Sequence, residues 1–477
     1  MVTRIMRHEW RLLGADRTLW VVVPLLAAII GYGVYNGALW VRFQEQTLRA
    51  AGEEEAGRHA RAKAEIAEIE RRGKQVQPFL DPRSAAVASG RAGVRYAAMP
   101  PAPLAALAVG QSDLYPYYFK VTRQSRQTFV SNDEIENPAN LLSGRFDLAF
   151  VIIYLYPLLI LALAYNLLSA EREQGTLAMM LSQPVALRTV ALGKAGARAL
   201  VVLLVAVGFS LAGFLLVGAD LARGDVWWRL LLWVAVVALY GAFWFALAVA
   251  VNAWGKSSAS NALMLAGLWL LFVLLVPSLL NVAVTAAYPV PSRVEMIQAT
   301  RRASAEATAR GSQVMARYFE DHPELAGDGA PDFNDFYTRS LALQEETERL
   351  VGPVTDYFDR QVLGQQVLVD RFRFLSPAVV TQAALNDLAG TSAERYRHFL
   401  SQVGAYHQSW KAYFAPRIVS KASLRPEDYD RAPAFAFREE PAAAVAARAS
   451  VGGAGLLVAT LLVAAAAVAA LRRYRLA

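Results

Sequence analysis

The sequence predicts an all-α polytopic membrane protein: six transmembrane helices and an α-rich extracytoplasmic domain formed by the loops after spans one and five. Two observations predict this class. Of the 477 residues, 55% are hydrophobic and only 18% are charged, whereas soluble domains average about 25% charged. The apolar residues also gather into stretches of about 20, the length at which a helix crosses a hydrocarbon core. This pattern excludes a disordered chain and argues against a plain soluble enzyme.

Six stretches without acidic, basic or histidine side chains reach this length. They are residues 18–40, 148–168, 199–218, 230–253, 261–286 and 449–470. We interpret the first as a retained anchor rather than a signal peptide. Its apolar run is too long for a signal peptide, and it ends at Trp40 without a small-residue cleavage site.

The positions of Lys and Arg predict the orientation of the spans. With the N-terminus inside, residues 1–17, 169–198, 254–260 and 472–477 face the cytoplasm. These pieces hold twelve basic and four acidic residues, an excess equal to the net charge of +8 of the whole chain. The basic character is therefore a topology signal, and it gives no reason to expect nucleic-acid binding.

Two long segments, residues 41–147 and 288–448, then lie outside the cytoplasm. We expect the first to begin with a helix that continues from the first span. Glu54 and Arg58 stand four residues apart there, as do Glu68 and Arg72, and this order of charges stabilises helices. The aromatic run at residues 115–119 is either a substrate contact or ordinary packing, and we favour packing.

The second long segment is predicted to be mostly helical. Apolar residues recur at three- and four-residue steps over 294–319, 336–351, 354–372 and 393–414. Pro353 separates the second helix of this series from the third. We expect both long segments to pack into one domain.

The cytoplasmic stretch after the second span contains a short charged entry, Gly175, a short apolar helix and a proline at position 184. Two interpretations fit this pattern. The short helix at the membrane surface either plugs into a groove of a partner protein or only turns the chain. The residues by themselves do not separate these alternatives.

The stretch resembles the signature of ABC-2-type transporter permeases, the membrane subunits of ATP-driven ABC exporters. The matching residues are Glu171, Arg172, Glu173, Gly175, Thr176 and Leu177, then Pro184, then Gly193 and Lys194. The resemblance implies that residues 171–184 form the coupling region that seats in a cleft of a separate ATPase subunit. It also implies that residues 1–17 form an amphipathic connecting helix at the membrane surface. The loop Lys256-Ser257-Ser258 fits the same family.

The extracytoplasmic part resembles a subfamily of these permeases that carries a large domain of unknown function. The matching residues are Leu375-Ser376-Pro377-Ala378, Leu388-Ala389-Gly390-Thr391, His398-Phe399 and Gln402-Val403. Common ABC-2 permeases have short outer loops, so this chain departs from them in the segments after spans one and five.

Catalytic motifs are not found in the sequence. Gly255-Lys256-Ser257 lacks the first glycine of a phosphate-binding loop, because position 250 is Ala250. The five histidines form no metal-spaced pair, and the chain has no cysteine. We therefore expect a non-catalytic subunit without a cofactor or metal of its own, whose partner ATPase binds ATP and magnesium.

A few polar residues interrupt the spans. The candidates for a substrate pathway are Tyr154, Tyr156, Asn166, Tyr240, Asn252 and Asn281. Such residues either join helices by hydrogen bonds or line a path. Pro157 and Pro277 are predicted to kink spans two and five.

These observations together predict a permease subunit of an ABC exporter in a bacterial inner membrane, with both termini cytoplasmic. Six spans are half of the usual complement for a substrate path, so a second copy or a sister permease is expected. The alternative is a mechanotransmitter or scaffold that drives its extracytoplasmic domain against a partner without moving a substrate.

Overall fold

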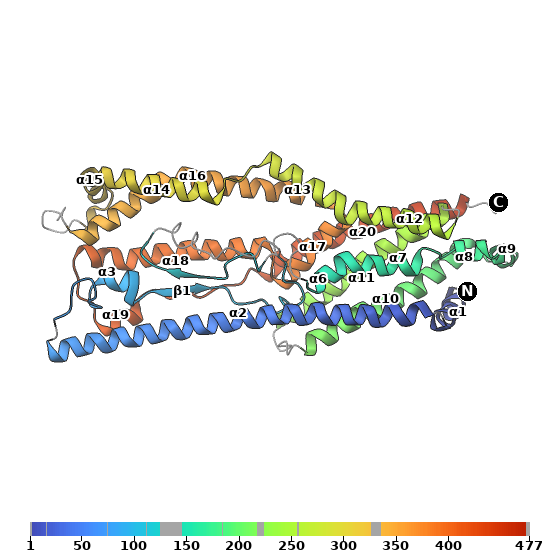
Figure 1. The fold of residues 1–477 in the computed structure, drawn as a ribbon, viewed down its shortest axis with the longest axis horizontal. Coiled ribbons are helices and arrows are strands. Elements are labelled where there is room, and N and C mark those ends of the chain that lie inside the picture. The colour runs from blue at the N-terminus through green and yellow to red at the C-terminus, as the bar shows by residue number, and fades with distance from the viewer. Residues whose placement is uncertain are drawn as a thin grey trace.

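The computed structural model describes residues 2–15, 17–73, 75–110, 112–124, 146–183, 185–216, 224–254, 257–325 and 335–473. The chain is elongated, with a bundle of apolar helices at one end and a second helical unit at the other (Figure 1). We call the second unit the loop domain; it is built from the described residues of 41–124 and 288–441.

Within the described residues, six helical stretches are long and apolar enough to cross a membrane, which confirms the predicted fold class. They lie in α2 (Arg17–Arg72), α6–η2–α7 (Leu148–Phe150, Val151–Leu155, Tyr156–Ala164), α10 (Leu187–Leu216), α11 (Gly224–Trp254), α12–η3–α13 (Ser258–Trp269, Leu270–Leu275, Val276–Ala287) and α20 (Ala442–Arg473). Helices α1 (Val2–Ala15), α8 (Ser169–Glu173) and α9 (Thr176–Leu181) lie at the end of the bundle remote from the loop domain.

The second and fifth spans are irregular at their prolines, as the sequence indicates. In each span a π-helical segment, η2 or η3, ends just before a helix whose first turn holds Pro157 or Pro277. Proline has no N–H to donate and crowds the preceding turn, and a π-helical turn accommodates that disruption.

Helix α2 extends the first span into the loop domain without a break. Its 56 residues span about 84 Å at 1.5 Å per residue. Leu26 and Ile30 are buried in the bundle, and Ile66 and Ile69 are buried in the loop domain. The predicted charge pairs form as well: Arg58 contacts Glu54 at 2.6 Å and Arg72 contacts Glu68 at 3.1 Å.

The loop domain has an aromatic core around α18 (Ala393–Val419). Trp410 and Phe399 are fully buried, and Phe119 stacks on Phe399 with 5.8 Å between ring centroids. Tyr115 stacks on Tyr396 at 4.4 Å, so packing accounts for these two members of the 115–119 run. Strands β1 (Arg95–Ala98) and β2 (Tyr118–Val121) form an antiparallel pair in which Arg95 faces Val121. The sequence did not predict these strands, because each is only four residues long.

Further helices complete the loop domain. They are α3 (Ala85–Val87), η1 (Ala88–Ala92), α14 (Arg293–Ala309), α15 (Gly311–Asp321), η4 (Pro323–Leu325), α16 (Phe336–Phe372), η5 (Arg373–Leu375), α17 (Pro377–Ala389) and α19 (Pro426–Arg431). The predicted break at Pro353 is wrong, because α16 continues through it. The helix predicted over 294–319 is instead divided at Arg310.

Helix α17 packs with the membrane-spanning helices, although its sequence lies within the second long loop. Val380, Ala384 and Leu388 belong to the same buried cluster as the residues of the spans. The small side chains allow close approach, since a Cβ at Gly452 of α20 would lie only 3.3 Å from Ala384 Cβ. The bundle therefore contains a seventh, shorter helix supplied by the loop domain.

Candidate functional site at the end of the bundle

The predicted coupling segment forms two short helices joined by a tight turn. We call residues 169–181, which comprise α8, Gln174, Gly175 and α9, the elbow. Gly175 has a φ of +73°, a left-handed conformation that other residues adopt only at a cost. Its N–H donates to Arg172 O at 3.1 Å and so ends α8. The glycine expected between the charged entry and the apolar helix thus sets the direction of α9.

Glu173 joins the elbow to the fifth span. Its carboxylate accepts hydrogen bonds from the backbone N–H of Ser258 at 2.6 Å and from the Ser258 hydroxyl at 2.9 Å. Ser258 is the first residue of α12, and a carboxylate is stabilised there by the free N–H groups and the helix dipole. The two loops that resemble the ABC-2 family therefore meet in space. Gly255 and Lys256 lie outside the described residues.

Glu171 joins the elbow to the third span. Its side chain forms an ion pair with Lys194 of α10. The Lys194 ammonium also donates to Leu167 O at 3.2 Å, and the Thr176 hydroxyl donates to Glu171 O at 3.2 Å. The two carboxylates of the signature thus connect one short segment to two different spans.

The short helix α9 has one anchored and one free face. Leu177 is only 1% exposed and belongs to the bundle core, whereas Met179 is 68% exposed. Arg172 lies in α8, and Pro184 falls outside the described residues. An exposed apolar side chain next to charged residues suits contact with another protein.

Directly before the elbow in the sequence, the second span is interrupted at residues 165–168, between α7 and α8. Asn252 of α11 fills the interruption: its amide donates to Ala164 O at 3.0 Å, and its oxygen accepts from Leu168 N at 3.1 Å. Asn261 of α12 donates to Tyr165 O at 3.2 Å. Irregular backbone at membrane depth requires such internal partners.

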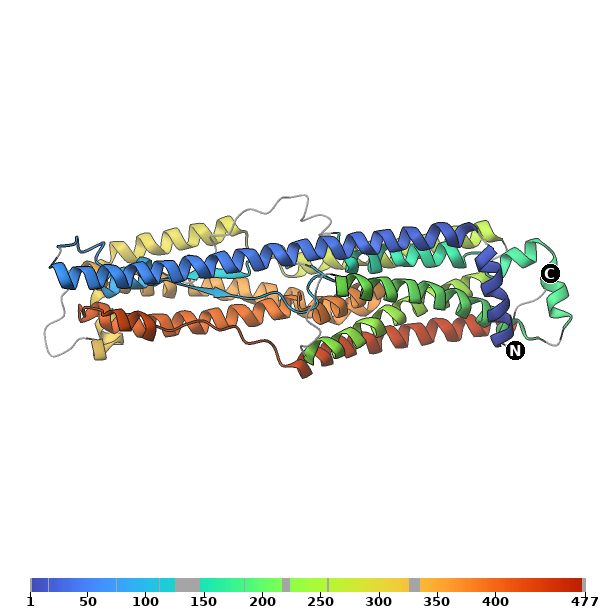
Figure 2. The same ribbon diagram turned by 90° about the horizontal axis from the view of Figure 1, so that it is seen from below.

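The N-terminal helix is tied to the same place. Arg198 of α10 donates to Glu9 at 2.8 Å and to the Asn166 amide oxygen at 3.2 Å. Trp10 donates through its indole to Ala197 O at 3.3 Å. Helix α1 therefore lies across the end of the bundle (Figure 2). The sequence did not single out Glu9, Arg198 or Asn261 as site residues; the charges of Glu9 and Arg198 beside apolar stretches were the available signal.

The other predicted pathway residues lie mostly within the helix packing. Tyr156 and Tyr240 are buried, and the Tyr240 hydroxyl donates to Ile153 O at 2.9 Å. Tyr154 is half-buried, with its ring 4.6 Å from that of Phe150. Asn281 is exposed on α13. The contacts of the buried residues join helices, and their role in a pathway stays a prediction.

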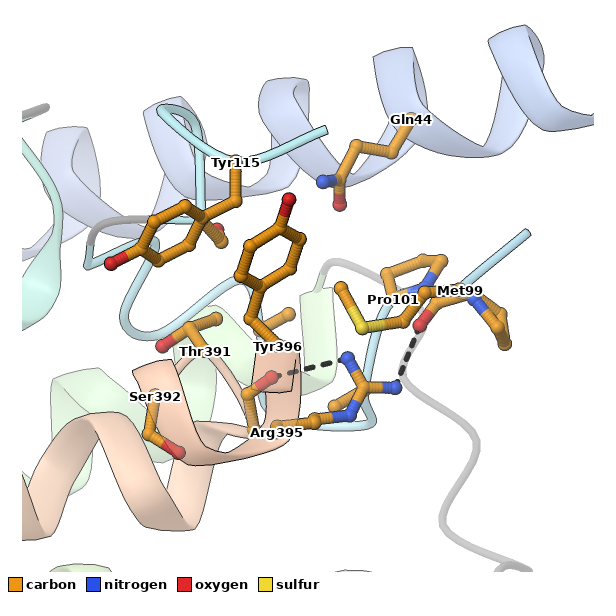
Figure 3. Close-up of a pocket in the computed structure, with 13 residues that line it drawn as sticks. Gln44, Met99, Pro101, Tyr115, Thr391, Ser392, Arg395 and Tyr396 are labelled. Atoms are coloured by element: carbon orange, nitrogen blue, oxygen red, sulfur yellow. Dashed lines mark hydrogen bonds between the residues drawn. The ribbon is translucent and has the colours of Figure 1, made fainter. Parts of the chain in front are cut away.

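At the opposite end of the bundle, Arg395 closes a small cavity between α17, α18 and the first long segment (Figure 3). It donates to Gly390 O at 3.2 Å, to Pro100 O at 2.8 Å and to both oxygens of Glu439. Gly390 ends α17 with a φ of +73°. The cavity volume of about 20 Å³ holds a water molecule rather than a substrate.

Two more contacts attach α17 to the spans nearby. Arg229 of α11 donates to Leu388 O at 3.0 Å. Arg448 of α20 contacts Asp387 at 3.2 Å and Glu440 at 2.8 Å. We call this set of contacts around Arg229, Arg395 and Arg448 the joint. Among the described residues, no group of three or more His, Cys, Asp or Glu side chains is placed to hold a metal ion.

Part of the chain matches a known family model. Residues 293–438 match a family model described as "Domain of unknown function (DUF3526)". The match covers less than a third of the chain, and includes α14 to α18. None of the curated proteins compared with the chain matches it.

Proposed function

We propose that this chain is the membrane-spanning permease subunit of an ATP-driven ABC transporter, an exporter, coupled to a separate cytoplasmic ATPase through residues 171–184. The elbow is the observation that carries the proposal. It projects from one end of the bundle and offers an exposed apolar side chain, Met179. It is also joined through Glu173 to α12 and through Glu171 to α10.

These contacts give a route for force. The partner ATPase binds ATP and magnesium and closes, and the closure displaces α9. The Glu173–Ser258 contact passes the displacement to the fifth span, and the Glu171–Lys194 pair passes it to the third. Asn252 links the interrupted second span to α11 and so carries the movement to the fourth. This chain contributes no catalytic group and no cofactor to the reaction.

The proposal places the elbow in the cytoplasm of a bacterium, with the protein in the inner membrane. In support, α1 and the end of α20 lie at the same end of the molecule as the elbow (Figure 1), which is the end rich in Lys and Arg. The proposed assembly contains a second copy or a sister permease. Exposed leucines on α12 and α13, such as Leu263 and Leu279, leave room for that partner as well as for lipid.

A charge reversal at the elbow tests the proposal. In a complex purified with its ATPase and placed in lipid nanodiscs, Glu173→Lys should abolish the stimulation of ATP hydrolysis by this subunit, because a lysine cannot accept the two hydrogen bonds from Ser258. Membrane insertion should be unchanged. The control is Glu53→Lys, which makes the same charge change on the exposed face of α2 in the loop domain. A fully coupled Glu173→Lys complex would overturn the proposal, as would ATP hydrolysis by this chain alone.

A mechanotransmitter is the second candidate. It is favoured by the unbroken α2, which belongs to both parts of the molecule, and by the buried joint that fixes α17 to the spans. In this case ATP hydrolysis moves the loop domain against an extracytoplasmic partner. A structure of the complete complex in lipid separates the candidates: a continuous cavity between the two permease copies favours export, and a close-packed seam favours mechanotransmission.

A further inference from the structure

The turn between α16 and α17, residues 372–376, lies beside two membrane-spanning helices. The Ser376 hydroxyl donates to Phe272 O at 2.5 Å. The Phe374 ring rests on Gly455, so closely that a Cβ there would lie 2.3 Å from a ring carbon. Both Phe272 and Gly455 belong to helices long and apolar enough to span a membrane. The turn is therefore at membrane depth, although it belongs to the loop domain in sequence.

The joint marks the membrane boundary from which the depth of this turn in the bilayer can be measured. Arg229 and Arg448 are the charged residues nearest to the apolar parts of α11 and α20 on the loop-domain side, and both contact the last turn of α17. Exposed Trp227 stands next to this level, where aromatic residues mark the membrane interface. From Leu388 back to Pro377, α17 covers about 16 Å at 1.5 Å per residue. One leaflet of the hydrocarbon core is about 15 Å thick.

Helix α16 reaches the same depth from the other side. Gly364 packs against the Tyr288 ring just beyond the end of α13, and the Gln365 amide donates to Tyr288 O at 2.7 Å. From Gly364 to the end of α16 at Phe372 the helix runs another eight residues, about 12 Å at helical rise, and η5 continues to Leu375. The two helices thus enter and leave the leaflet on the loop-domain side as a re-entrant pair.

The exposed side chains of the turn have the chemistry of a lipid contact. Phe374 is 46% exposed and Leu375 is 60% exposed, and Phe372 is exposed beside them. Arg371 is exposed immediately before this apolar tip, while Arg373 lies over the Phe374 ring and pairs with Asp370 at 3.2 Å. An arginine beside an apolar tip can bury its aliphatic stem among acyl chains while its guanidinium extends toward the lipid headgroups.

We propose that residues 371–375 form a lipid-binding wedge in the leaflet on the loop-domain side, in which Phe372, Phe374 and Leu375 contact acyl chains and Arg371 binds a lipid phosphate. The wedge requires only that the six apolar helices span a bilayer. It therefore holds for an exporter and for a mechanotransmitter alike.

Site-specific fluorescence tests the wedge, and the absence of cysteine from the chain makes single-cysteine labelling direct. Leu375→Cys is labelled with an environment-sensitive fluorophore and reconstituted in phosphatidylcholine vesicles that contain lipid with an acyl-chain nitroxide. The matched control is Phe336→Cys, at the remote end of the same helix α16, where Phe336 is 71% exposed. Phe372→Cys gives a second site on the turn if Leu375→Cys does not fold.

The nitroxide lipid should quench the label at position 375 several-fold more strongly than the label at 336, and aqueous iodide should do the reverse. Iodide quenching of position 375 as strong as that of position 336 would overturn the proposal. Protection from both quenchers, together with efficient disulfide formation between two Leu375→Cys chains, would show that the turn is an interface between copies and would also overturn it.

A second substitution tests Arg371. Arg371→Glu should reduce the lipid quenching at position 375, because a carboxylate is repelled by lipid phosphate, whereas Arg371→Lys should preserve it. Equal quenching in Arg371→Glu and the parent protein would refute the phosphate contact.

Discussion

The two ends of the membrane bundle hold their helix ends in different ways. At the joint, α17 contacts two arginines that are almost wholly buried, Arg229 at 7% exposed and Arg395 at 6%, and a third, Arg448, that is 28% exposed. At the elbow, the Glu171–Lys194 pair is largely buried, but the Glu173–Ser258 contact is exposed to solvent and a single glycine sets the direction of α9. Buried charged groups with all partners in place lock one arrangement, whereas exposed polar contacts contribute little and exchange readily. We infer that α17 is held rigidly at the loop-domain end of the bundle, whereas α9 can move at the elbow.

The largest expected effect comes from breaking the joint. Arg395→Ala removes four hydrogen bonds and leaves two carbonyl groups and the partly exposed Glu439 without their partner, which should destabilise the protein by about 2–4 kcal/mol. Thermal unfolding in detergent measures this loss. The control is Arg397→Ala on the same helix, whose side chain is 39% exposed; its effect should stay within about 1 kcal/mol. Equal effects of the two substitutions would remove the contrast between the ends of the bundle.

The interruption of the second span offers the next largest effect. Asn252→Leu keeps a similar volume but leaves Leu168 N without its acceptor and removes one hydrogen bond each from Ala164 O and the Asn261 amide. Each unsatisfied buried group costs about 1–3 kcal/mol. We expect faster hydrogen exchange in residues 165–173 and a lower unfolding temperature. Ser210→Ala, at a buried position on α10 whose hydroxyl donates to Ala206 O of the same helix, should leave exchange at 165–173 unchanged.

A smaller effect is expected at the turn of the elbow. Gly175→Ala places a side chain in open space but at a positive φ, which costs about 1–2 kcal/mol. The elbow should lose order locally and ATPase stimulation should fall, while the unfolding temperature of the bundle changes little. Gly52→Ala, in open space at an ordinary helical position of α2, is the matched control. A drop in global stability for Gly175→Ala would mean that the elbow is as rigid as the joint.

The smallest effect concerns the far tip of the loop domain, which serves as a reference for both ends. Partial burial lowers the pKa of His322, but the carboxylates of Glu345 and Glu324 raise it more, so the net pKa lies above its ordinary value of 6.5. A pKa raised by folding stabilises the protein fully below the unfolded value, and this stabilisation is lost as pH rises through the folded pKa.

His322→Gln should therefore flatten the decline of loop-domain stability as pH rises from slightly acidic to slightly alkaline. The change should be under about 1 kcal/mol, because the site is partly exposed. Unfolding midpoints across that pH range measure it. A decline that persists unchanged in His322→Gln would assign the titration to another group.

Local patterns in the sequence were enough to predict several parts of the molecule. Apolar length defined the six spans, the Glu-to-Arg spacing predicted the outward extension of α2, and Gly175 between charged and apolar residues predicted the shape of the elbow. Pro157 and Pro277 marked the irregular turns of the second and fifth spans, where a π-helical segment precedes each proline. The helix break predicted at Pro353 was wrong, because Pro353 lies on an exposed face where α16 continues with one hydrogen bond fewer.

The contacts between distant segments, in contrast, could not be predicted from local pattern and became visible in the fold. The positions of Glu173 and Ser258 in the sequence do not indicate that these residues form a hydrogen bond. The same holds for the contacts of Arg395 with Pro100 and Glu439. In each case the fold brings distant segments together. Helix α17 is the clearest case. Its thirteen residues are too few to register as a span, and its small side chains carry no local signal of depth. Its place among the membrane helices follows from shape and from buried arginines, which are properties of the assembled fold.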